Sequence, residues 1–154
     1  MAKSRYSSGI GTKIFIGSAV GILLLAVVLM IFSLSKSGRF NSFKKELTAI
    51  SGGVKSKIFV EYRGETSEIT KKEFGRVYAL LISARRRDHV GGAKITDTCS
   101  IHISNIGGEE GVLTIDKTDT EYIKVTYQSS KSEYIYWFQC AFGSILNLAG
   151  ATAK

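Results

Sequence analysis

The stretch "KIFVEYRGETSEITKKEFGRVYALL" (residues 57–81) decides the fold, because a strand pattern passes directly into a helix pattern within it. Ile58, Val60 and Tyr62 occupy alternate positions, so a strand would place their side chains on one face. Gly64 then marks a turn, and a short second arm follows it. The first half of the stretch therefore predicts a β-hairpin.

The second half predicts a helix that begins with a capping box, "TKKE" (residues 70–73). The Thr70 hydroxyl can accept from the Glu73 amide, while the Glu73 carboxylate reaches back to the Thr70 amide. Large apolar side chains then recur on one helical face: Phe74, Val77, Tyr78 and Leu81. We expect this helix to run to about Arg86.

Three consecutive arginines, Arg85, Arg86 and Arg87, fall at the end of that predicted helix. Cations are favourable there, because the carboxyl end of a helix carries partial negative charge. The functional alternative is a contact with an anionic partner, such as a phosphate or a lipid headgroup.

The rest of the chain alternates like a meander of strands joined by short, turn-rich connections. The strand patterns are "TCSIHISN" (98–105), "GVLTIDK" (111–117), "EYIKVTY" (121–127) and "SEYIYWFQ" (132–139). A closing helix is expected within "FQCAFGSILNLAG" (138–150), capped near Gly150. The sequence thus predicts an α+β domain over residues 55–150, with an antiparallel sheet of four to five strands packed by one or two helices.

One long apolar segment, residues 14–34, precedes this domain and contains no charged residue. As a helix it would reach about 32 Å, which is enough to cross a bilayer. We therefore expect a single transmembrane helix, with the basic tail of residues 1–13 in the cytoplasm and the domain outside the cell membrane. A cleaved signal peptide and the reverse orientation are the alternatives.

Residues 35–54 are expected to form a short juxtamembrane helix with one apolar face, made by Phe40, Phe43, Leu47 and Ile50. This helix could pack on its own domain, lie on the bilayer or pair with a second copy. In the membrane segment, Gly17 and Gly21 form a G-x-x-x-G pattern that allows two helices to approach closely. Pairing through both surfaces would give a homodimer, whereas glycine is also common in membrane helices that pair with nothing.

The formal net charge is +8, and the basic excess lies in residues 1–94. A basic half beside a membrane anchor suits contact with anionic lipid or with a cell-wall polymer. The same basic residues could instead only keep the domain soluble and flank the membrane segment. The sequence contains no nucleic-acid-binding motif, so nucleic acid is not expected as a partner.

The chemistry-bearing residues predict no catalytic, cofactor or metal site. Cys99 and Cys140 permit one disulfide in an external domain, or remain buried free thiols, and they lack zinc-ligand spacing. Asp97, Cys99 and His102 are close in sequence, but on a strand Cys99 and His102 would point to opposite faces. The remaining candidate is the stretch "YIYWF", where Tyr134, Tyr136 and Trp137 either enter the core or form an exposed partner-binding face.

The chain resembles small, single-span, membrane-anchored extracytoplasmic α+β domains of Gram-positive bacteria. Three stretches carry the resemblance: residues 57–81, the meander "IHISN…GVLTID…YIKVTY" and the closing "EYIYWFQCAFGSIL". The resemblance covers about residues 57–149 and transfers no functional residues. It implies a non-catalytic accessory domain. The layout of short tail, span and α+β domain is also similar to that of small scaffold subunits of secretion machines.

The sequence therefore leads us to expect a membrane protein that presents an interaction domain to other membrane or envelope proteins. Two alternatives remain open. One is a membrane-tethered hydrolase with an unrecognised site, and the other is a cytoplasmic-facing domain that binds anionic lipid.

Overall fold

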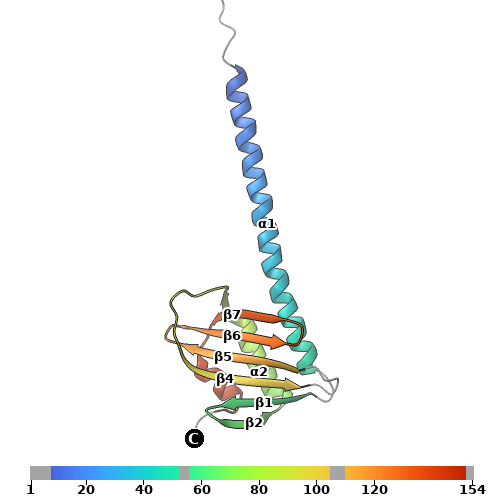
Figure 1. Ribbon diagram of the computed structural model, residues 1–154, viewed down its shortest axis with the longest axis vertical. Helices are drawn as coiled ribbons and strands as arrows, with labels where there is room; N and C mark the ends of the chain where they lie inside the picture. Colours follow the sequence, from blue (N-terminus) through green and yellow to red (C-terminus); the bar gives the residue numbers. More distant parts are fainter. Residues whose placement is uncertain (1–7, 53–55, 105–109, 152–154) are drawn as a thin grey trace, which may run out of the picture. The chain divides into compact units, whose positions relative to one another are not determined.

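The computed structural model describes residues 8–52, 56–104 and 110–151 (Figure 1). The chain divides into two compact units, Met1–Asn41 and Ser42–Lys154, which we describe separately. The helices are α1 (Ser8–Gly52), α2 (Lys71–Ser83) and α3 (Phe142–Leu148). The strands are β1 (Lys57–Tyr62), β2 (Glu65–Ile69), β3 (Arg85–Arg87), β4 (Ile95–Ser104), β5 (Glu110–Thr118), β6 (Tyr122–Ser129) and β7 (Glu133–Gln139).

The second unit is built on one antiparallel sheet with the strand order β2-β1-β4-β5-β6-β7-β3. The α+β class and the antiparallel sheet are confirmed. The expected size of four to five strands is wrong, because the described residues already form seven strands in this sheet. The additional strand β3 lies in the arginine cluster, where we expected the end of a helix.

Helix α2 begins as its sequence predicts and ends earlier than expected. The Thr70 hydroxyl accepts from the Glu73 amide at 3.2 Å, and the Thr70 amide donates to the Glu73 carboxylate at 2.7 Å, so the capping box is present. The helix stops at Ser83 because Ala84 is extended, with φ −72° and ψ 151°. This turn of the backbone directs the next three residues along β7.

The core lies between one face of the sheet and the helices α2 and α3, which Figure 1 shows behind the strands. Alternate residues of the strands supply its apolar side chains, which include Ile58, Val60, Ile101, Leu113, Ile115 and Val125. From α2, Phe74, Val77 and Leu81 are buried, as their helical spacing predicts. Helix α3 starts at Phe142, later than the pattern suggested, because Phe138 belongs to β7.

The last turns of α1, from Ser42 onward, belong to this second unit and complete its core. Phe43 and Leu47 are 1% and 0% exposed. The Phe43 ring meets the rings of Tyr127, Tyr134 and Tyr136 at centroid distances of 6.0, 5.9 and 5.4 Å. This part of the predicted juxtamembrane helix, from Ser42 onward, therefore packs on its own domain.

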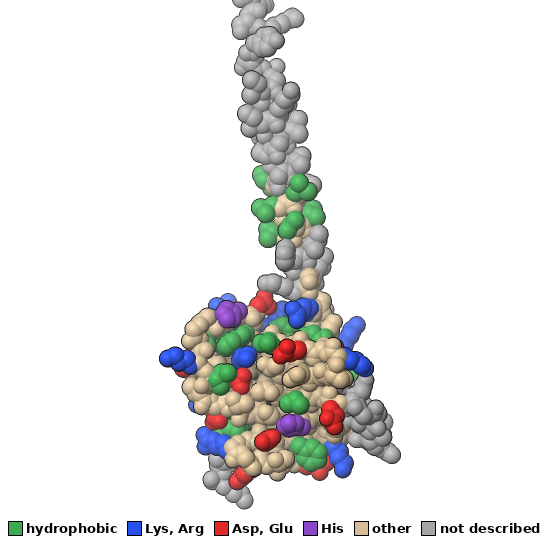
Figure 2. Space-filling model, viewed as in Figure 1, with side chains coloured by type: hydrophobic (Ala, Val, Ile, Leu, Met, Phe, Trp, Pro, Cys, Tyr) green, Lys and Arg blue, Asp and Glu red, His purple; other side chains and the backbone are tan. Residues whose placement is uncertain are grey.

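No helix of the described residues covers the other face of the sheet, and Figure 2 shows acidic, basic and histidine side chains scattered there among uncharged groups. Small hydroxyl side chains form a row across three strands, where Ser100 pairs with Thr114 and Thr114 pairs with Thr126. Along each strand of such an antiparallel sheet, apolar side chains that face the core alternate with polar side chains that face water.

In the first unit, α1 carries large apolar side chains that are exposed at nearly every described position from Ile22 to Met30. Within the residues that the structure describes, no helix combines the length and the apolar character needed to cross a bilayer. The transmembrane helix expected over residues 14–34 stays a prediction.

Candidate functional site

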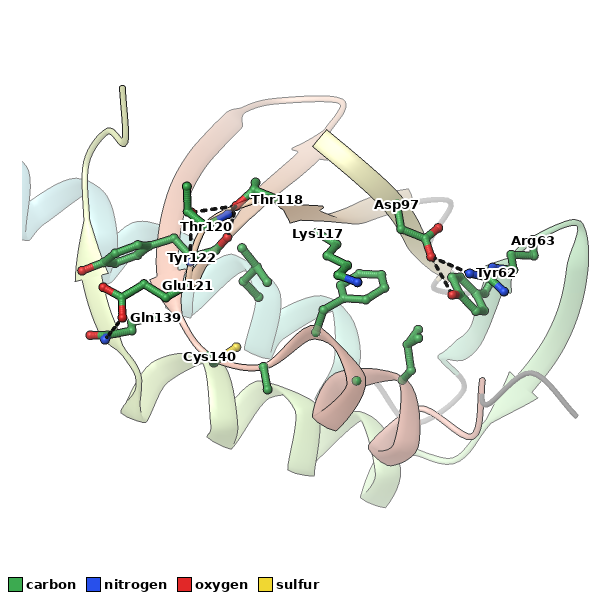
Figure 3. A pocket seen from close by; sticks show the side chains of 15 residues that line it. Tyr62, Arg63, Asp97, Lys117, Thr118, Thr120, Glu121, Tyr122, Gln139 and Cys140 are labelled. Atoms are coloured by element: carbon green, nitrogen blue, oxygen red, sulfur yellow. Dashed lines mark hydrogen bonds and ion pairs between the residues drawn. The ribbon is translucent and has the colours of Figure 1, made fainter. Parts of the chain in front are cut away.

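A pocket of about 650 Å³ opens where α3 meets the end of the sheet (Figure 3). Its walls come from four separate segments: the β1–β2 turn, the start of β4, the β5–β6 turn and the chain from β7 into α3. Volumes of this order are typical of small-molecule sites. The pocket is therefore a concave candidate site for a small molecule.

One end of the pocket holds a polar cluster around Asp97. The Tyr62 hydroxyl donates to the Asp97 carboxylate at 2.7 Å, and the Arg63 guanidinium pairs with the same oxygen at 3.1 Å. The Tyr62 hydrogen bond, helped by Arg63 and the Thr98 amide, holds the pKa of Asp97 below its ordinary value. The same bond raises the pKa of Tyr62, because ionised Asp97 accepts from the protonated phenol.

A second polar cluster lies at the other end (Figure 3). The Gln139 amide donates to the Glu121 carboxylate at 2.7 Å. The Thr118 hydroxyl donates to the Tyr122 carbonyl, and the Thr118 and Thr120 hydroxyls lie 2.8 Å apart. These contacts fix the β5–β6 turn that forms this wall.

Between the two clusters, the pocket is lined by apolar groups and one lysine. Ile123, Phe142 and Leu146 provide the apolar surface, and Cys140 adds a half-buried thiol. Burial raises the pKa of Cys140 to about 11, so the thiol stays protonated near neutral pH and acts as a weakly polar wall. Lys117 extends over this surface from β5 (Figure 3).

Asp97 should make the stability of this end of the domain sensitive to acid. Because its folded pKa is lowered, the carboxylate contributes stability above its ordinary pKa, and that contribution is lost as the pH falls through the folded value. At about pH 6 we expect the urea midpoint of the wild type to exceed the midpoint of Asp97→Asn. At about pH 2 we expect the two midpoints to be equal. The exposed substitution Glu65→Gln on β2 serves as the control and should follow the wild-type profile. Equal pH profiles for Asp97→Asn and wild type would contradict the prediction.

The residues expected to pair helices are divided between the two units. Gly17 and Gly21 lie in α1, but their surroundings fall outside the described side chains, as does the side chain of Ile50. Phe40 is half-exposed in the first unit. Phe43 and Leu47 face the sheet of their own domain, so they are occupied by the core and are not available to a second copy.

The three arginines do not form one patch, because a strand sends neighbours to opposite faces. Arg85 and Arg87 are exposed, and the Arg87 guanidinium lies 5.2 Å from the Tyr122 ring centroid. Arg86 is half-buried on the helix-covered side, with its guanidinium 5.3 Å from the Tyr136 ring centroid.

The aromatic residues of β7 are likewise divided between the two faces of the sheet. Tyr134 and Tyr136 pack against Phe43 in the core. Trp137 points the other way and meets the His89 ring edge-on at 6.1 Å. All three are 7–8% exposed, so they do not form a common exposed surface.

The sequence cluster of Asp97, Cys99 and His102 is separated in the structure. Cys99 is fully buried in the core, whereas His102 lies on the uncovered face, 3.3 Å from the Glu61 carboxylate. Both cysteines are free thiols. Among the described residues, no three His, Cys, Asp or Glu side chains gather as the ligands of a metal ion would.

Sequence reasoning did not select the pocket, because its walls are far apart along the chain. One signal was nevertheless present at Lys117. Leu113, Ile115 and Lys117 alternate on one face of β5, so a lysine occupies the face that otherwise enters the core. A charged residue at the end of an apolar alternation marks the place where the core opens to solvent.

Comparisons with protein families, with curated proteins and with solved structures find no match to this chain.

Proposed function

We propose that this chain is a single-pass membrane protein whose α+β domain is a non-catalytic binding module on the outer side of the cell membrane. It would act there as an accessory or scaffold subunit for other envelope proteins. The proposal has two parts, the anchor and the binding role of the domain, which are tested separately.

The observation that carries the anchor is the exposure of apolar side chains around α1. The described large side chains between Ile22 and Met30 are 46–69% exposed: Ile22, Leu24, Leu25, Val27, Val28, Leu29 and Met30. They occupy seven of the nine positions from 22 to 30, and at about 100° per residue these positions are spread around the whole helix. A helix that is apolar all round needs a non-aqueous environment, and a lipid bilayer provides it.

The short connection between anchor and domain supports a membrane-proximal role. The uncharged segment ends at residue 34, and the compact second unit begins at Ser42. A partner of this domain would accordingly be sought among membrane and envelope proteins, with crosslinking in intact cells as the direct measurement.

Alkaline extraction of cell membranes tests the anchor. We expect the full chain to stay in the membrane pellet and the double variant Leu25→Lys, Val28→Lys to be extracted, since each lysine at a helix centre costs about 2.5–3.5 kcal/mol of insertion free energy. The matched control, Thr66→Lys with Ser67→Lys on exposed β2, should remain in the pellet. Extraction of the wild-type chain would refute the anchor.

Protease treatment of intact cells tests the side of the membrane. Loss of the domain without lysis supports the outer location. Full protection until lysis would contradict it and favour the cytoplasmic, lipid-binding alternative.

A further inference from the structure

We propose that the pocket beneath α3 binds a small apolar carboxylate, with Lys117 holding the carboxylate group and the apolar surface holding the body of the molecule. This inference does not depend on the membrane anchor, because it concerns a site inside the second unit.

The shape and lining of the pocket suit a compact apolar molecule. Its volume of about 650 Å³ falls within the roughly 300–1,000 Å³ of typical ligand pockets. The wall toward α3 is made by Phe142 and Leu146, and Ile123 faces it from β6. The protonated thiol of Cys140 adds no charge to this surface. An aromatic ring or a short alkyl chain would bury its surface there.

The charged side chains around the pocket favour an anionic ligand, because the carboxylates there have partners and Lys117 has none among the described carboxylates. Asp97 is engaged by Arg63 and Tyr62, and Glu121 accepts from Gln139, so both carboxylates already have partners within the domain. Asp97 is the cross-strand partner of Lys117, but its carboxylate is bonded to Tyr62 and Arg63. No carboxylate of the described residues lies within ion-pair distance of the Lys117 ammonium group. A ligand carboxylate would supply the missing counter-charge at the centre of the pocket.

The two polar ends also limit the charge of the ligand. Asp97 and Glu121 lie at opposite ends, with Lys117 between them (Figure 3). A second negative group on the ligand would approach one of these carboxylates and be repelled. The geometry therefore favours a monocarboxylate over a phosphate ester or a dicarboxylate.

Calorimetry on the purified full chain in a mild uncharged detergent tests the inference without requiring insertion into a bilayer, with the detergent solution alone as background. The probes are 4-phenylbutyrate, its amine analogue 4-phenylbutylamine and inorganic phosphate. We expect the acid to bind at least about tenfold more tightly than the amine, because a hydrogen bond to a charged group contributes about 1.5–3 kcal/mol and about 1.4 kcal/mol is tenfold in affinity. Phosphate should not bind. Equal affinity for acid and amine, or no heat from the acid, would overturn the proposal.

Variants of Lys117 assign the binding to this pocket. Lys117→Met should weaken phenylbutyrate binding by about tenfold or more, and Lys117→Arg should keep most of the affinity. The control is Lys57→Met, an exposed lysine at the far end of β1, and it should bind as the wild type does. Amide chemical shifts should change at residues 117–123 and 139–146. Unchanged affinity in Lys117→Met, or shift changes confined to other residues, would contradict the site.

The two proposals fail independently. A chain that is extracted at alkaline pH and still binds phenylbutyrate through Lys117 loses the anchor and keeps the pocket. A chain that stays in the membrane and gives no Lys117-dependent heat loses the pocket and keeps the anchor.

Discussion

Alanine in place of Phe43 should lower the unfolding free energy of the domain by about 3–5 kcal/mol. The Phe43 side chain is 1% exposed and meets three tyrosine rings from β6 and β7. Truncation removes the apolar contacts and leaves a cavity that the surrounding aromatic rings cannot fill without moving. The substitution would also detach the last turns of α1 from the sheet, because Phe43 is the largest group that they bury.

Urea unfolding followed by tryptophan fluorescence measures this effect, since Trp137 is the single tryptophan and is buried in the domain. The matched control is Ile135→Ala, a large apolar side chain that is 44% exposed on the uncovered face. We expect the control to cost about 1 kcal/mol or less. Equal midpoints for Phe43→Ala and wild type would show that the end of α1 is not part of the core.

Gly111→Ala should be the second severe substitution, with a cost of about 1–3 kcal/mol from overpacking. A Cβ atom at position 111 would lie 2.8 Å from both Cε2 and the hydroxyl oxygen of Tyr127. Tyr127 cannot easily retreat, because it is fully buried and its ring is stacked on Tyr134 and edge-on to Phe43. The closeness of the β5 backbone to this ring therefore requires glycine.

Gly75→Ala is the natural comparison, because the same chemical change should raise the stability of the domain there, whereas at Gly111 it should lower it. Gly75 lies in α2, and an added Cβ atom would meet nothing within 4 Å. We expect alanine there to stabilise the domain by about 0.5–1 kcal/mol through its better helix propensity. Unfolding midpoints that shift in the same direction for both variants would argue against the steric explanation at Gly111.

The start of α2, the strands of the meander and the cap after α3 depend mainly on neighbouring residues, so the sequence was sufficient to predict them. The capping box at Thr70 and Glu73 fixes the start of α2, and apolar or aromatic runs between turn-rich connections identify the four strands of the meander. Glycine at position 150 has φ +64° and follows α3, as a helix cap requires.

Tertiary pairing determined the features that the sequence did not reveal. The residues of β3 are all arginine, so nothing in their own polarity distinguishes a strand from the end of a helix. Pairing of Arg86 with Phe138 on β7 makes them a strand. The pocket has the same origin, because its two polar ends and its apolar wall come from segments that only the folded sheet brings together.

The attachment of α1 to the last hairpin of the sheet sets the order in which the domain can be completed during synthesis. Glu46 accepts hydrogen bonds from Ser132 and Tyr134, residues that follow it by 86 and 88 positions. The first part of the domain to leave the ribosome must therefore wait until β7 has been made before its own side chains can be buried. Until then Phe43 and Leu47 remain exposed on the nascent chain, where they can be covered by a chaperone.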